Sequence, residues 1–478
     1  MKQNILSKAG LFILLVAMLS SCSKWIDPDM NINPDAPTVV PMDLLLPTIE
    51  ARFAYNIVQG NDGQRTLSLW IQHMTGIARQ SQAEGAYSFR AGDANNNWGS
   101  VYSGVLMDIK QLVDMSKQEK TKSTQFEGVG KILKAATIGY ASDLWGDIPF
   151  SEALQGDENL KPAFDSQKDI YASIQSLLDE GIYLLKNPDA KDVFTLDGDI
   201  IFGGKADKWI AAAYALKARY ALHLSKVNND AYTKALDYLE NAMDGASGSA
   251  YYYYADGNNN NANPLFLFMQ DRGDIRVSDV MIDGLKATND PRIVVYANPI
   301  GDTLVVDDVI YPPGSYVGAP AGVPLDGAST PGSGIASSNT KTPIITFTEV
   351  KFIEAECKAK TGDEDGAKDA LKAAVAASLN EYGVYNEGWV DTVYNVKVDD
   401  LSGNALYEEI MNDKWVALMY NFEAYNDWRR TGLPKLTPNP VASGKEIPRR
   451  FPYPTDALTY NPNTPQGVSI WDRIWWDK

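Results

Sequence analysis

Two aspartates four residues apart, Asp143 and Asp147, have the residue type and spacing best suited to chemistry in this sequence. Paired carboxylates can act as a general acid and base or can bind a metal ion. Gly146 and Pro149 lie in the same stretch and disfavour a continuous helix, because glycine weakens it and proline lacks the backbone donor. We therefore predict a structural elbow between two helices, in which Trp145 is buried and the aspartates cap the returning chain.

Glu408 and Glu409 are a second pair of neighbouring carboxylates. A glycoside hydrolase needs two carboxyl groups about 5 to about 9.5 Å apart, one on each side of the scissile bond. Adjacent residues on a helix point about 100° apart, so Glu408 and Glu409 cannot flank one bond. Asp143 and Asp147 are then the pair left for a lipid-anchored glycoside hydrolase, which stays open as an alternative function.

The sequence contains two histidines, His73 and His223, and two cysteines, Cys22 and Cys357. Both histidines fall on helical patterns, and we interpret them as satisfied helix residues rather than as bases or ligands. The cysteines are far apart and form no C-x-x-C motif, which argues against a structural zinc site. We predict that Cys357 is an inert core thiol and that the protein has no catalytic residue, metal ion or cofactor.

The N-terminus has the pattern of an exported lipoprotein. Residues 1–8 are basic, and residues 9–20 are apolar but too short to span a bilayer, which takes about 20 residues. The tetrapeptide Leu-Ser-Ser-Cys that ends at Cys22 resembles a bacterial lipobox, whose cysteine is acylated and becomes the new N-terminus. We predict a signal peptide over residues 1–21, lipidation of Cys22, and a flexible tether over residues 22–41.

The net charge of −18 at pH 7 bears on the class of partner. Nucleic-acid binding needs a basic surface, so nucleic acid is a poor partner for this chain. Tyrosine (25) and tryptophan (11) are numerous beside phenylalanine (14). Their flat apolar faces with a hydrogen-bonding edge suit sugar or peptide surfaces.

A helical scaffold has to position these side chains. Apolar residues recur at i, i+3, i+4 and i+7 through much of the chain, which is the spacing of amphipathic helices. The predicted helices cover residues 42–59, 64–80, 98–113, 128–142, 165–185, 207–224, 231–244, 346–360, 367–378 and 407–428. Trp98 lies on the apolar stripe of its helix, and we interpret it as core packing.

Ala355, Gly362, Ala367 and Ala374 match the small-residue positions of a tetratricopeptide repeat. Small residues at these positions let paired helices approach closely. We predict a mainly α fold, in which tetratricopeptide-like helix pairs form one scaffold with long irregular loop insertions and a few short β-strands. This scaffold and its insertions are expected to make a single domain over residues 42–478.

Three insertions interrupt the helices, at residues 81–97, 246–263 and 297–343. The third contains β-like pieces at residues 303–306 and 309–311. Loops on a rigid scaffold carry binding residues disproportionately often, so we expect the function to lie on these insertions.

Several stretches in a shared order resemble the SusD/RagB family of lipoproteins. Residues 414–432 are similar to the family's C-terminal "ERw-EG-R-wDlrRtG" helix. Residues 448–454 resemble its closing "iP-R-ypYP" turn, residues 349–356 its "E-kFi-AEa" helix, residues 290–292 its "DPR", and the elbow its "yGdiPy-EA". Lys414, Ala424 and Asn426 depart from the family pattern and are nearer to the SusD-like subfamily.

The resemblance implies a nutrient-binding lipoprotein of the outer membrane, exposed at the cell surface and without enzymatic activity. Members of the family sit as a lid on a SusC-like TonB-dependent β-barrel transporter and deliver glycans or, in some members, peptides. The resemblance also implies four tetratricopeptide-like helix pairs, with the ligand site in the irregular remainder. An oligosaccharide is the first interpretation of the ligand, and a peptide stays open.

By resemblance, the ligand contacts lie in a loop just before the Trp98 helix and in the middle insertions. An aromatic face beside amide groups can satisfy the apolar patch of a sugar ring and its hydroxyls together. The predicted ligand-binding residues are Tyr87, Phe89, Arg90, Asn96, Tyr252 and Tyr311.

Overall fold

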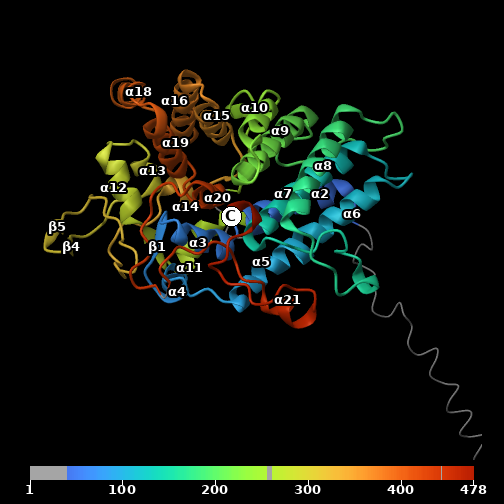
Figure 1. The fold of residues 1–478 in the computed structure, drawn as a ribbon, viewed down its shortest axis with the longest axis horizontal. Helices are drawn as coiled ribbons and strands as arrows, with labels where there is room; N and C mark the ends of the chain where they lie inside the picture. The colour runs from blue at the N-terminus through green and yellow to red at the C-terminus, as the bar shows by residue number, and fades with distance from the viewer. Residues whose placement is uncertain (1–39, 256–260, 443) are drawn as a thin grey trace, which may run out of the picture. The chain divides into compact units, whose positions relative to one another are not determined.

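The computed structural model describes residues 40–255, 261–442 and 444–478 (Figure 1). Residues 42–478 form one compact unit. The predicted signal peptide, Cys22 and most of the predicted tether lie outside the described residues. The described chain is mainly helical with a few short strands, which confirms the predicted fold class.

Long helices that pack side by side form the scaffold (Figure 1). They are α6 (Met107–Ser116), α7 (Thr124–Trp145), α8 (Gln167–Lys186), α9 (Ala206–His223), α10 (Ala231–Leu239), α15 (Phe347–Thr361), α16 (Glu364–Glu381) and α19 (Gly403–Ala417). Each of α6 to α10 contacts the next in order, α10 contacts α15, and α15 contacts both α16 and α19. The helical hairpins predicted from periodicity at residues 128–185, 207–244 and 346–378 are present.

Side-chain caps set where several of these helices begin. Ser123, Ser166 and Thr346 each accept a hydrogen bond from the backbone N–H three residues further on. Such a cap satisfies a donor that has no partner within the helix and contributes about 1 kcal/mol. Gly362 ends α15 with a φ of +91°, a conformation that glycine adopts without the Cβ clash of other residues.

The other helical segments precede, interrupt and follow the scaffold. The first group is α2 (Met42–Arg52), η2 (Phe53–Val58), α3 (Asn61–Trp70), α4 (Arg79–Gly85), η3 (Ala91–Ala94), α5 (Asn95–Gly99) and η4 (Ser100–Leu106). The middle group is η5 (Gly156–Glu158), η6 (Leu224–Lys226), η7 (Ala246–Gly248), α11 (Pro264–Asp271), α12 (Asp279–Ala287), α13 (Ile293–Tyr296) and α14 (Ser333–Ala336). The last group is α17 (Glu387–Trp389), η9 (Val390–Tyr394), α18 (Asn395–Asp399), α20 (Phe422–Thr431), α21 (Thr455–Tyr460) and η10 (Trp475–Asp477).

In the part of the chain that the structure describes, six short strands pair into antiparallel two-stranded sheets. They are β1 (Met74–Gly76), β2 (Ala250–Tyr252), β3 (Ile275–Val277), β4 (Leu304–Val306), β5 (Val309–Tyr311) and β6 (Thr342–Ile345), paired as β1–β3, β2–β6 and β4–β5. The β-like pieces predicted at residues 303–306 and 309–311 form the β4–β5 hairpin. Sheets this small do not make a core of their own. The β2–β6 pair joins the second insertion to the end of the third, and β4 and β5 pair with each other within the third.

Two predicted helices are each interrupted. The helix expected over residues 64–80 ends at Trp70, because Gln72 adopts a φ of +57° and the following residues pair with β3. The prediction that His73 lies on a helix is therefore wrong. The helix expected over residues 407–428 is divided into α19 and α20 by a turn at Tyr420, whose φ is +56°.

The predicted insertions contain more regular structure than expected. Residues 81–97, predicted as a loop, include most of α4, all of η3 and the start of α5. Residues 246–263 contain β2, and residues 256–260 within them lie outside the described chain. Residues 297–343 are largely irregular apart from β4, β5, α14 and the start of β6.

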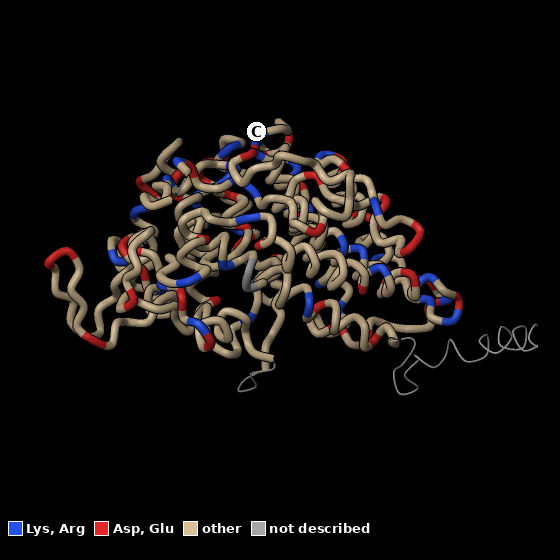
Figure 2. Tube along the Cα trace, turned by 90° about the horizontal axis from the view of Figure 1, so that it is seen from below, with Lys and Arg blue, Asp and Glu red and all other residues tan. Residues whose placement is uncertain are grey.

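The core follows the apolar faces of the scaffold helices. Cys357 lies in it, fully buried with Ala218, Leu222 and Ile353, and burial raises the pKa of its thiol, which agrees with an inert core cysteine. Within the described residues, no helix combines the length and apolar character needed to cross a membrane. Basic and acidic positions are interspersed along the chain trace (Figure 2).

Candidate functional site

An aromatic cleft lies between the start of the Trp98 helix, the chain that returns from the elbow, and α21 near the C-terminus. Its volume is about 260 Å³, close to the lower limit of small-molecule pockets, about 300 Å³. It is lined by Trp98, Tyr102, Pro149, Ala153, Leu154, Leu160, Pro162, Phe164, Asp456, Ala457, Tyr460 and Asn461. Three segments far apart in the sequence thus meet in one concave, aromatic surface.

The floor of the aromatic cleft is held by packing beneath it. Trp98 and Tyr102, one turn apart, have ring centroids separated by 4.6 Å, and Phe164 stacks on Trp98 at 6.2 Å with 22° between the planes. Behind them, the indole of the fully buried Trp145 lies edge-on to Trp98 at 5.0 Å. The Tyr102 hydroxyl donates to the carbonyl oxygen of Pro149 at 2.8 Å. The rings of the floor are therefore fixed before any ligand arrives.

The rim of the aromatic cleft is open to solvent. Tyr460 is 73% exposed and Leu160 is 72% exposed. Asp456, also exposed, lies in the first turn of α21. An exposed ring beside a carboxylate can bind the apolar face of a sugar by stacking and accept hydrogen bonds from its hydroxyls.

Three of the predicted ligand-binding residues, Tyr87, Phe89 and Tyr252, are buried, and their ligand contacts stay predictions. Tyr87 is 3% exposed, and its hydroxyl accepts a hydrogen bond from the backbone N–H of Asn439. Phe89 packs between Trp70 and Phe451. Tyr252 lies in β2, packed against η2 and Tyr254.

The other three predicted ligand-binding residues are at least partly exposed but do not line the aromatic cleft. Arg90 and Asn96 are exposed on the segment that contains η3, which packs against α21. Tyr311 is half-buried at the end of β5, with the Lys286 ammonium 5.9 Å from its ring centroid. The structure therefore brings together neither the three exposed residues nor the six as a set, and their ligand contacts stay predictions.

The aromatic cleft contains residues that were not predicted from the sequence. Trp98 was interpreted as core packing alone, yet it is half-buried and both supports the core and faces the cleft. Phe164 and Tyr460 lie in short polar segments next to Pro162 and Asn461. Phe164 lies in an irregular segment and Tyr460 is the last residue of the short helix α21, so neither belongs to a long apolar stripe from which its role could be predicted.

The elbow carboxylates have separate structural roles. Asp147 accepts a hydrogen bond from the backbone N–H of Gln167 at 2.8 Å, so it caps the returning helix as predicted. Asp143 is fully buried and does not cap it. The indole N–H of Trp476 and the hydroxyl of Tyr171 donate to one oxygen of Asp143, and Asn426 donates to the other.

Asp143, His223 and Glu423 form a buried cluster whose ligand atoms all lie within 4.8 Å of one another, a donor set suited to a metal ion. His223 bridges the two carboxylates, with Nε2 2.8 Å from Glu423 and Nδ1 3.4 Å from Asp143. Burial lowers the pKa of His223, but the two carboxylates outweigh burial and raise that pKa to about 9. Without a metal ion, the protonated imidazole lies between the two carboxylates, and the three groups form a buried ion-pair cluster.

The two carboxylate pairs considered for a hydrolase lie away from the aromatic cleft. Asp143 is fully buried behind the aromatic cleft, while Asp147 is exposed and occupied as a cap. Glu408 forms an ion pair with Lys435 and Glu409 forms one with Lys397, so these two point to different partners. None of these four carboxylates lines the aromatic cleft.

We expect the His223 cluster to make the protein less stable as the pH rises. The folded-state pKa of about 9 exceeds the ordinary value of 6.5. The stabilisation is therefore fully present below pH 6.5 and is lost as the pH rises through 9. A shift of this size corresponds to about 3 kcal/mol. Urea denaturation between pH 6.5 and 9 should show that the difference in free energy of unfolding between wild type and His223→Gln shrinks as the pH rises.

His73 provides a matched control with the opposite sign. Burial lowers the pKa of His73 to about 3, outweighing the hydrogen-bonded carbonyl of Trp415, which raises it. The contribution of His73 does not vary with pH above 6.5 and is lost as the pH falls toward 3, so His73→Gln should change the pH dependence of stability only on the acid side. A constant difference between wild type and His223→Gln from pH 6.5 to 9 would contradict the protonated bridge.

Comparisons with known proteins agree with this architecture. The family model SusD-like_2, described as "Starch-binding associating with outer membrane", matches residues 34–454. A SusD/RagB family protein from Bacteroides thetaiotaomicron is similar in structure, with a TM-score of 0.77, 25% sequence identity, and coverage of 92% of this chain and 99% of that one. A chitin-binding SusD homolog from Flavobacterium johnsoniae has the same fold, with a TM-score of 0.74, 22% identity, and coverage of 92% and 97%.

A search of curated proteins finds no match to this sequence. The family model nevertheless covers most of the chain, from the predicted tether to the start of α21. The chain belongs to the SusD-like family, whose description is starch-binding and associated with the outer membrane.

Proposed function

We propose that this protein is a cell-surface lipoprotein that captures an oligosaccharide in the aromatic cleft. It passes the ligand to a SusC-like TonB-dependent transporter of the outer membrane, and the lipid on Cys22 anchors it there. Membership of a family described as starch-binding supports the ligand class. The observation that carries the proposal is the cleft itself, with Trp98, Tyr102 and Phe164 as its floor and Tyr460 exposed at its rim.

The geometry of the aromatic cleft favours a sugar over a peptide. Its surface is built from flat rings, and Asp456 at the rim accepts hydrogen bonds but offers none when ionised. A peptide in an extended conformation would need a row of backbone donors and acceptors. The Tyr102 hydroxyl and the Asn461 side-chain amide are already donating to Pro149 and Pro162, so they are committed to holding the cleft together.

The test is binding to a panel of oligosaccharides and peptides, measured by isothermal titration calorimetry. Tyr460→Ala should weaken oligosaccharide binding several-fold without changing thermal stability, because its ring is 73% exposed and stacking contributes about 1 kcal/mol beyond burial. Phe164→Ala, on the floor, should weaken binding at least as much.

Tyr183→Ala is the matched control. Tyr183 lies on α8, is 66% exposed, and does not line the aromatic cleft. Its removal should leave affinity unchanged. If wild type and Tyr460→Ala bound every glycan with equal affinity, the glycan site would lie elsewhere on the protein. If the protein bound peptides and no glycan, the ligand would be a peptide and the proposed ligand class would be wrong.

A further inference from the structure

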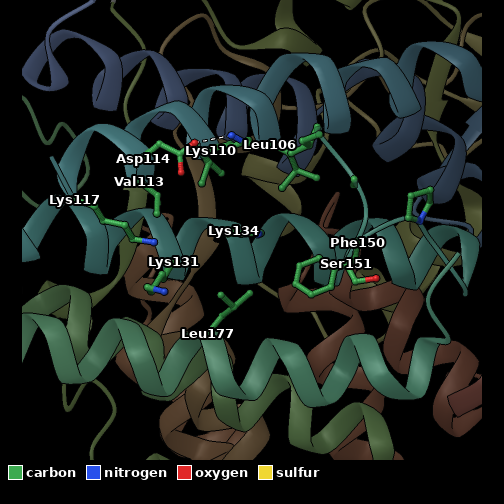
Figure 3. Close-up of a pocket in the computed structure, with 14 residues that line it drawn as sticks. Leu106, Lys110, Val113, Asp114, Lys117, Lys131, Lys134, Phe150, Ser151 and Leu177 are labelled. Atoms are coloured by element: carbon green, nitrogen blue, oxygen red, sulfur yellow. Dashed lines mark hydrogen bonds and ion pairs between the residues drawn. The ribbon is translucent and has the colours of Figure 1, made fainter. Parts of the chain in front are cut away.

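A second cavity, the lysine pocket (Figure 3), shares part of its lining with the aromatic cleft. Its volume is also about 260 Å³, and it opens between α6, α7, α8 and the returning segment 149–154. Its lining includes four lysines: Lys110, Lys117, Lys131 and Lys134. Pro149, Ala153 and Leu154 line both cavities, so a single strap of chain separates them.

The lysine pocket is cationic in a protein whose net charge is −18. Asp114 is the one acidic residue in its lining, and it is paired with Lys110 across one helical turn at 2.6 Å. Lys117 and Lys131 share a single oxygen of Glu127, each at 3.6 Å, which is longer than a direct charge-assisted hydrogen bond. Lys131 also pairs with Glu180 at 2.6 Å. Positive charge therefore exceeds negative charge along the walls of the pocket.

Among the four lysines of the pocket, Lys134 has the least negative charge near its ammonium group. Its ammonium lies over the ring of Phe150, 4.9 Å from the centroid, and the described residues place no carboxylate within ion-pair distance of it. Burial lowers the pKa of Lys134, and the ammonium groups of Lys131 and Lys117 lower it further, against the weaker opposite effect of Asp114 and Glu180. An ammonium has three donors, so a bound anion would both accept its hydrogen bonds and relieve this repulsion.

The position of the lysine pocket indicates what kind of molecule would carry the bound anion. Phe150 and Leu177 add apolar surface beside the lysines, as Figure 3 shows, so the pocket can hold a charged group attached to a larger molecule. A ligand whose rings occupy the aromatic cleft would have the strap, and then the lysines, immediately beside it.

We propose that the lysine pocket binds a negatively charged substituent, a sulfate ester or a uronate carboxylate, of an oligosaccharide held in the aromatic cleft. This inference rests on the proposed function and narrows its ligand class to acidic glycans. Half-buried charges are screened less by salt than exposed ones, so the preference should persist at moderate ionic strength.

The test compares matched charged and neutral probes by calorimetry: an oligogalacturonide with its methyl ester, and a sulfated oligosaccharide with its desulfated form. The charged member of at least one pair should bind about tenfold more tightly, a ratio that also identifies which anion the pocket takes. Lys134→Met and Lys117→Met, on different helices, should each remove much of this preference and leave binding of the neutral member unchanged. Lys372→Met on α16, outside the pocket, should change neither.

A second readout separates this inference from the proposed function. The rate at which an amine-reactive reagent acylates Lys134, measured by mass spectrometry, should fall in the presence of inorganic sulfate. The rate of acylation of Lys372 should not change. Equal binding of charged and neutral glycans without sulfate protection overturns the anion pocket and leaves glycan capture standing. Sulfate protection without binding of any glycan supports the pocket and overturns the proposed function, and failure of both readouts overturns both.

Discussion

Replacing Arg430 with methionine is expected to lower the free energy of unfolding by about 3–5 kcal/mol. Arg430 is buried on α20, where one guanidinium nitrogen lies 2.7 Å from Glu356 of α15 and 2.7 Å from Asp427. Without it, the Glu356 carboxylate stays buried, with the Lys414 ammonium 3.8 Å away. The loss reflects an uncompensated buried charge, which costs far more than an exposed ion pair contributes.

Urea denaturation of single and double variants measures this loss, with the midpoint shifting at constant slope. Removing both charges in Glu356→Leu/Arg430→Met should recover much of the stability, because a buried pair replaced by apolar groups is often neutral. Lys372→Met, which breaks the exposed pair with Asp399, should cost no more than about 1 kcal/mol. A loss below 1 kcal/mol in Arg430→Met would show that the cluster does not hold α20 to α15.

Trp145→Ala is expected to cost about 3–5 kcal/mol, the range for truncating a fully buried aromatic side chain. The indole is 0% exposed, packs edge-on against Trp98 and Phe451, and donates from Nε1 to the carbonyl oxygen of Pro452 at 3.0 Å. It therefore joins the elbow to the C-terminal segment. Because Trp145 supports Trp98, the variant should also lose glycan affinity, unlike the Arg430 variant.

Trp145→Phe provides the graded control for this prediction. A phenyl ring retains most of the packing but leaves the Pro452 carbonyl without its donor, so the loss should be nearer 1–3 kcal/mol. Differential scanning calorimetry of the three proteins would rank them wild type, Trp145→Phe and Trp145→Ala. If Trp145→Ala unfolded within 1 °C of wild type, the elbow would not be the structural centre that its sequence predicts.

The motifs that carried the family resemblance hold buried ion pairs, and most of these pairs join distant parts of the chain. Glu349 pairs with Arg219 on α9, Asp290 pairs with Arg292, and Glu356 pairs with Arg430. The closing turn places the carbonyl oxygen of Pro452 against Trp145. Buried charges tolerate few substitutes, because an unpaired one is costly, so motifs of this kind are recognisable in the sequence and report on the fold rather than on the ligand.

The predicted binding residues show where reasoning from the sequence fails. An aromatic residue in an irregular segment has no periodicity, so nothing in the sequence separates a ring that will be covered from one that will face solvent. Phe89 and Tyr252 are covered by Phe451 and by η2, which come from distant segments. Tyr460, the last residue of α21, is left 73% exposed.

The sequence by itself determined the helical scaffold, the elbow, the buried thiol of Cys357 and the family, because helix periodicity, glycine and proline chemistry and spaced motifs act locally along the chain. Only the tertiary structure decided which aromatic rings form the cleft and which lysines face one pocket. The cleft joins segments hundreds of residues apart, as Trp98 and Tyr460 show, and the lysine pocket joins α6, α7, α8 and the segment that returns from the elbow. Which side chains come together depends on how the helices pack and on which surfaces become covered. Neither can be predicted from a single stretch of the sequence.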